Sequence, residues 1–149
     1  MPRSRITATH PAGPDHAVST VEGGTGAYRR APCQTCPWRV DAVGAFPAEA
    51  FRHSANTGTD GTHFSPDAMH TFACHESGAA KPATCAGYIL RGNDAISWRI
   101  AAALGRFDPG QVSDGGVDLF GSYFEMAVAN GVGAEEPAML RCKPWRLRD

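Results

Sequence analysis

The sequence predicts a mostly α-helical single domain with long irregular loops and a disordered N-terminal leader. Three observations predict this class. The chain of 149 residues has the length of one domain. Apolar residues recur at helical spacing in several short segments, whereas strand signals are weak. The 17 glycines and 11 prolines indicate extensive loops, and because such a domain buries little apolar surface, we expect an added cross-link to stabilise it.

Composition divides the chain into three parts. Residues 1–30 are rich in Pro, Gly, Ser and Thr without an apolar period, which predicts a flexible leader. Residues 31–131 carry the helical patterns and form the predicted domain. Residues 132–149 end in a basic stretch, which predicts a C-terminal tail.

The sequence of the first half of the domain predicts two short helices. Residues 47–56 begin with Pro47, a residue favoured in the first turn, and Glu49 complements the helix dipole. Residues 70–75 are too short and mixed for a helix and are expected to be extended or irregular. Residues 82–91 predict a second helix, which a Gly-Asn pair closes.

The second half predicts two longer helices separated by a turn-rich connector, residues 111–118. Asp94 is a suitable N-cap for the first of them. Residues 119–130 predict the second, which Gly131 ends. The apolar residues of the first helix share one face, namely Ile96, Ile100, Ala103 and Leu104.

Charge and hydropathy narrow the functional class and the compartment. The net charge of −1 excludes a globally basic nucleic-acid binder. No run of 18 apolar residues is present, so no membrane span is expected, and the N-terminal stretch has no apolar segment typical of a secretory signal. We therefore predict a cytoplasmic protein. Because a reducing cytosol rarely sustains disulfides, its five cysteines indicate metal binding or redox chemistry.

Four of these cysteines form the most specific pattern in the chain. Cys33 and Cys36 are separated by two residues, a spacing that lets both sulfurs converge on one ion or cluster. Cys74 and Cys85 follow within the predicted domain. We predict that these four cysteines bind one metal cofactor and staple the small fold, whereas Cys142, in the basic tail, is a spare thiol.

Other interpretations of the cysteines remain open. Unliganded cysteines are ordinary small apolar residues in protein cores. Cys33 and Cys36 are also a candidate redox dithiol, although the Trp-Cys-x-x-Cys helix opening of thioredoxin-like proteins is missing. His75 follows Cys74 directly and is an alternative ligand, which would give a Cys3His zinc site.

Two cofactors compete for the four-cysteine set. Zinc commonly uses two knuckles of closely spaced ligands, but Cys74 and Cys85 are widely spaced. Pro37 follows Cys36 directly, as proline follows the last cysteine in bacterial ferredoxin runs. The sequence therefore favours a [4Fe–4S] cluster over Zn²⁺. The apolar wall that a cluster needs is expected from Trp38, Phe72 and Tyr88.

Three motifs resemble a poorly characterised domain-of-unknown-function family of actinobacteria and their phages. They are Cys-Gln-Thr-Cys-Pro-Trp-Arg at 33–39, Phe-Ala-Cys-His at 72–75 and Cys-Ala-Gly-Tyr at 85–88. The resemblance covers about residues 31–106 and implies cysteine ligands. A more distant similarity is to the WhiB-like regulators, which hold a [4Fe–4S] cluster and bind a sigma factor. Their cysteine order and their Gly-Trp-Gly-Gly turn differ from this chain, so sigma-factor binding is not implied.

The function expected from these features is that of a regulatory or interaction protein rather than an enzyme. No P-loop, dinucleotide-binding fingerprint, zinc-protease motif or deaminase pairing is present. Alternatives are a zinc-stabilised structural or nucleic-acid-binding module, and a metal-dependent redox enzyme using His63, His70, His75 or Glu76. The expected macromolecular partner, protein or nucleic acid, would contact an Arg/Trp surface and the basic tail. That set comprises Arg39, Arg91, Arg99, Arg106, Arg141, Lys143, Trp145, Arg146 and Arg148.

Overall fold

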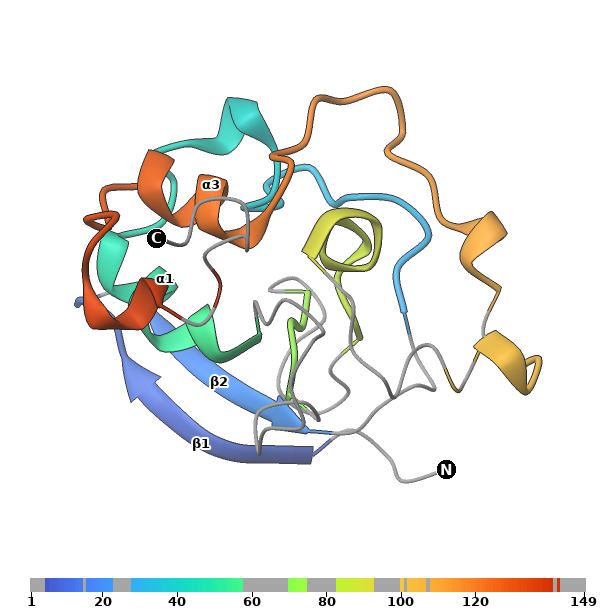
Figure 1. Ribbon diagram of the computed structural model, residues 1–149, viewed down its shortest axis with the longest axis horizontal. Coiled ribbons are helices and arrows are strands. Elements are labelled where there is room, and N and C mark those ends of the chain that lie inside the picture. Colours follow the sequence, from blue (N-terminus) through green and yellow to red (C-terminus); the bar gives the residue numbers. More distant parts are fainter. Residues whose placement is uncertain are drawn as a thin grey trace.

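The N-terminal part of the chain forms a β-hairpin beside a group of short helices (Figure 1). The computed structural model describes residues 5–14, 16–22, 28–57, 70–74, 83–92, 100, 102–106, 108–140 and 142. Strand β1 (Arg5–Pro11) pairs antiparallel with β2 (Ala17–Glu22). The short strand β3 (His70–Thr71) adds to the other edge of β2, giving the order β1-β2-β3.

The prediction of a disordered leader over residues 1–30 is wrong for the two strands of the hairpin. Both strands contain several β-branched residues, with Ile6 opposite Val21 in the register, and such residues favour extended backbone. A Pro-Ala-Gly-Pro turn joins the strands, with Gly13 at a φ of 113°. The hairpin packs on a helix of the domain, so it belongs to the fold.

Helix α1 (Ala48–Ser54) lies where the sequence predicted it, after Pro47, and continues into the 3-10 turn η2 (Ala55–Thr57). It packs against β2 and against α3 (Tyr123–Ala129). Helix α3 begins later than predicted because the Ser122 hydroxyl accepts a hydrogen bond from the Glu125 N–H and so caps it. It ends before Gly131, whose φ is 103°.

The predicted helix at 82–91 is shorter than expected. Thr84 is extended and bridges both Tyr28 and Ala73, so helical backbone begins only at Ala86 and runs into the π-helical turn η4 (Tyr88–Gly92). The remaining elements are single 3-10 turns. They are η1 (Val40–Ala42), η5 (Pro109–Gln111) and η6 (Pro137–Met139).

Most of the helix predicted from Asp94 lies outside the described residues. Its described part includes Ile100 and Leu104, joined by a main-chain hydrogen bond of 3.0 Å from the Leu104 N–H to the Ile100 carbonyl. Both residues are exposed, at 52% and 59%, so neither Ile100 nor Leu104 enters the core. Among the described residues, no helix is both long enough and apolar enough to cross a membrane.

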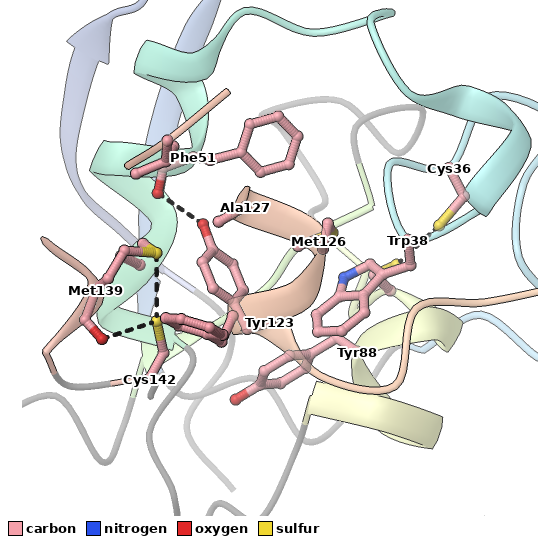
Figure 2. Packing of buried hydrophobic residues seen from close by; sticks show 13 residues of the cluster. Cys36, Trp38, Phe51, Tyr88, Tyr123, Met126, Ala127, Met139 and Cys142 are labelled. Atoms are coloured by element: carbon pink, nitrogen blue, oxygen red, sulfur yellow. Dashed lines mark hydrogen bonds between the residues drawn. The ribbon is translucent and has the colours of Figure 1, made fainter. Parts of the chain in front are cut away.

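The core gathers aromatic, methionine and cysteine side chains around α3 (Figure 2). The Tyr123 hydroxyl donates a 2.7 Å hydrogen bond to the Phe51 carbonyl of α1. Met139 and Cys142 are also buried there, and the Cys142 thiol lies 3.6 Å from the Met139 carbonyl oxygen. Cys142 is therefore a core residue, and its expected place in a tail beyond the domain is wrong.

Candidate metal centre

The first cysteine pair occupies a tight turn. The Cys36 N–H donates to the Cys33 carbonyl over 3.2 Å, and the Arg39 N–H donates to the Cys36 carbonyl over 3.0 Å. These consecutive turns bury Cys36, whose exposed fraction is 0%, and leave Cys33 partly exposed. The C-x2-C spacing thus presents one sulfur to the core and one near the surface.

The second cysteine pair, Cys74 and Cys85, lies on two extended segments that main-chain hydrogen bonds join. The Cys74 N–H donates to the Ala83 carbonyl over 2.7 Å, and the Cys85 N–H donates to the Phe72 carbonyl over 2.9 Å. These bonds flank the antiparallel pair formed by residues 73 and 84. Because side chains alternate along a strand and directly opposite residues share a face, Cys74 and Cys85 lie on one face as diagonal neighbours.

The two pairs meet through their buried members. The sulfurs of Cys36 and Cys85 lie 3.5 Å apart, and Cys85 is 2% exposed. A bonded disulfide requires about 2.05 Å between sulfurs, and none of the five cysteines, all described, is in a disulfide. The structure therefore brings together two thiols that are remote in sequence.

The environment shifts the pKa values of these two thiols in opposite directions. The hydrogen bond with the Cys85 thiol lowers the pKa of Cys36, and the Trp38 N–H, the Cys33 thiol and the Arg39 charge act in the same direction. That same hydrogen bond, followed by burial, raises the pKa of Cys85 well above its ordinary value. Cys36 is thus the more acidic thiol of the pair, and a cysteine binds a metal ion in its deprotonated form.

Three aromatic rings enclose the thiols. The rings of Trp38 and Phe72 meet edge to face with centroids 5.9 Å apart, and Phe72 stacks on Tyr88 at 6.2 Å. The apolar wall expected from the sequence is therefore present, and Figure 2 shows Trp38 between Cys36 and Tyr88. Within the described part of the chain, the buried indole N–H of Trp38 meets no hydrogen-bond acceptor.

Not every residue expected at the site is brought together. No group of three His, Cys, Asp or Glu side chains in the described ranges is arranged to hold a metal ion. His63, His75 and Glu76 lie outside those ranges, and His70 belongs to β3. Cysteine sulfurs nevertheless have the chemistry that zinc and iron–sulfur cofactors require.

The expected Arg/Trp surface is only partly described. Arg99, Arg141 and residues 143–149 lie outside the described residues, whereas Arg91 and Arg106 are exposed. Arg39 is different, because only 19% of its side chain is exposed and its guanidinium makes hydrogen bonds of 2.8 and 2.7 Å to the Asp41 carboxylate. Arg39 therefore supports the cysteine turn rather than forming an open contact surface.

Sequence reasoning missed Gly87 and Asp41. Gly87 lies against Trp38, and the Cys-Ala-Gly motif gave no sign of which residue would cover the glycine. Asp41 lies two residues after Arg39. A charge pair is not expected at that spacing, because it requires a turn between the two residues. The opposite charges of Arg39 and Asp41, close together in the sequence, were the only signal that could have indicated this pair.

The fold and the paired thiols define a small cysteine-rich domain of short helices and loops. The chain belongs to the family described as "Family of unknown function (DUF6283)", which matches residues 28–143. Those residues include all five cysteines and leave the hairpin strands outside the matched region. No curated protein and no solved structure matches the chain.

Proposed function

We propose that the protein holds one metal ion on cysteine thiolates and acts as a regulatory or interaction protein rather than as an enzyme. The observation that carries this proposal is the 3.5 Å separation of the buried Cys36 and Cys85 sulfurs. Burial in apolar surroundings disfavours the charged thiolates that bind a metal ion. A cation bound by both sulfurs would compensate that charge, since a buried unpaired charge is costly.

The sulfur separation favours zinc among the two cofactors. Four sulfurs at the tetrahedral zinc–sulfur distance of about 2.3 Å lie about 3.8 Å from one another, close to the 3.5 Å between Cys36 and Cys85. In a [4Fe–4S] cluster each cysteine binds a different iron, which holds the sulfurs farther apart. We therefore propose Zn²⁺ and retain the cluster as the alternative.

The proposed ligands are Cys33, Cys36, Cys74 and Cys85. Cys33 is supported by its hydrogen bond to the Cys36 thiolate, and Cys74 by sharing a ladder face with Cys85. His75, beside Cys74, is the alternative fourth ligand. A site with four protein ligands has no open position for water, so it favours a structural role over hydrolytic catalysis.

A macromolecular partner completes the proposal. Ile100 and Leu104, one helical turn apart, are both more than half exposed, and Arg106 is exposed beside them. Apolar residues with a neighbouring arginine are characteristic of protein interfaces. A protein partner is thus better supported than a nucleic acid, because the net charge of −1 offers little attraction for phosphates.

The test is anaerobic purification of the full chain, followed by metal analysis and an absorption spectrum. A colourless protein with one zinc per chain is the expected result. A brown protein with about four irons per chain would replace zinc by the cluster, and a metal-free protein that folds would refute the proposal. Cys85→Ser should lose the metal, whereas the matched control Cys142→Ser should retain it.

A further inference from the structure

Three of the cysteines form a series from the surface to the core. Cys33 is partly exposed, while Cys36 and Cys85 are buried. Cys33 interacts with Cys36, which lies 3.5 Å from Cys85. Each sulfur is thus next to the following one, an arrangement suited to thiol–disulfide exchange.

We propose that this series makes the centre a redox switch, in which peroxide attacks Cys33 and the final product is a Cys36–Cys85 disulfide. This redox switch would regulate the proposed metal centre. It rests on the proposed function for one consequence, the release of the metal. Forming the disulfide removes two thiolates from the ligand set, and two remaining ligands hold zinc weakly.

The chemistry balances in three steps with hydrogen peroxide as the oxidant. The Cys33 sulfur attacks peroxide, the O–O bond breaks, and water leaves to give a sulfenic acid. The Cys36 sulfur then attacks Cys33, and the S–O bond breaks with loss of a second water. Finally the Cys85 sulfur attacks Cys36, and Cys33 leaves as a thiol. In total, two thiols lose two electrons and two protons, and peroxide becomes two waters.

The fold favours the Cys36–Cys85 disulfide over the intermediate Cys33–Cys36 disulfide. The fold already holds Cys36 and Cys85 in contact although residues 37–84 separate them, and a bond across a long loop restricts the unfolded chain more than one across two residues. The product is also buried, whereas a disulfide that includes Cys33 remains open to external thiols.

The experiment uses the reduced full-length protein, whose metal content is measured first. The protein is then treated with stoichiometric hydrogen peroxide, remaining thiols are alkylated, and disulfides are mapped by peptide mass spectrometry while a chromogenic chelator follows zinc release. We expect a Cys36–Cys85 disulfide, with zinc appearing at the same rate. The matched control Cys142→Ser should behave as the unchanged chain.

The Cys33→Ser variant tests the point of attack. It should give the same Cys36–Cys85 product at least about tenfold more slowly, because its remaining paired thiols are buried. A stable Cys33–Cys36 product, no disulfide, or an unchanged rate in Cys33→Ser would overturn the inference. A metal-free protein that still forms the Cys36–Cys85 disulfide would support the switch chemistry while refuting the metal function.

Discussion

Gly87 and Trp38 are in such close contact that a Cβ on the glycine would lie 2.5 Å from the Trp38 Cβ and 2.7 Å from its Cγ. The contact joins the Cys-Pro-Trp turn to the Cys-Ala-Gly turn, and so joins the segments that carry Cys36 and Cys85. Neither backbone has room to yield, because Trp38 is fully buried and touches the rings of Phe72, Tyr88 and Tyr123.

Gly87→Ala should therefore destabilise the fold by about 1–3 kcal/mol, the range for overpacking a dense core. Urea unfolding followed by circular dichroism measures this cost. Gly121→Ala is the control and should cost less, because the nearest atoms to its added Cβ belong to the exposed carboxylate of Glu125, which can rotate away at the cost of one exposed 2.9 Å hydrogen bond from the Gly121 N–H. Equal stability of the two variants would contradict the close packing.

Tyr123→Phe should cost about 0.5–1.5 kcal/mol, because it removes the buried 2.7 Å hydrogen bond that the Tyr123 hydroxyl donates to the Phe51 carbonyl. The Ser54 hydroxyl, 2.5 Å from the Tyr123 oxygen, also loses a partner. Ser54→Ala is the control and should cost less, since the Tyr123–Phe51 bond remains. Burial raises the pKa of Tyr123, so on titration to pH 11 the Tyr123→Phe variant should show the same phenolate absorbance as the unchanged chain while both stay folded.

Stability should fall at acidic pH partly through Glu136. Hydrogen bonds from Arg52 lower the folded-state pKa of Glu136, as does the Gly133 N–H. A lowered pKa gives stability that is present above the unfolded value of about 4.5 and is lost as the pH falls through the folded value. Glu136→Gln should flatten the decline of the urea midpoint below pH 5. An unchanged pH profile would exclude this ion pair as a contributor.

The hairpin should detach locally when its histidine contact is removed. The rings of His10 and His53 stack with centroids 4.6 Å apart and an interplanar angle of 2°. His10→Ala should speed amide exchange in β1 and β2 while the core around α3 keeps its protection, because hairpin opening exposes little of that core. Thr9→Ala, on the same strand, is the control and should have a smaller effect, because it removes only the exposed 3.3 Å hydroxyl contact with Ser19 and leaves the histidine stack in place. Equal acceleration in the core would mean that the hairpin and domain unfold together.

Local patterns located α1 and α3 but missed the strands. Pro47 and the α3 periodicity identified two helices because their signals are confined to neighbouring residues. The hairpin was missed because its Thr-rich strands lie among Pro and Gly residues, which suit a flexible leader equally well. Thr84 was assigned to a helix, but its partners Tyr28 and Ala73 are far away in the chain and draw it into an extended bridge.

The sequence indicated which residue types could carry the chemistry of the candidate site, but not how those residues are arranged in space. Cysteine spacing selected the residues, and two of them, Cys36 and Cys85, are in contact. The lowered pKa of Cys36 depends on the Cys85 thiol, the Trp38 N–H and the Arg39 charge, which reach the sulfur only after the chain has folded. Cys142 was misplaced because the basic residues around it are typical of a tail, whereas the 3-10 turn at Pro137–Met139 directs the chain back into the core.

The backbone bridges that surround the thiols have a kinetic consequence. Tyr28 with Thr84, and Arg39 with Leu119, join segments that are remote along the chain, and such contacts slow folding because long loops must close before they form. The contact between Cys36 and Cys85 is a closure of the same kind, because residues 37–84 separate the two thiols. A chain emerging from the ribosome therefore has no assembled thiol pair until residue 85 has been synthesised, so metal uptake at the proposed centre should follow the early collapse of the chain rather than guide it.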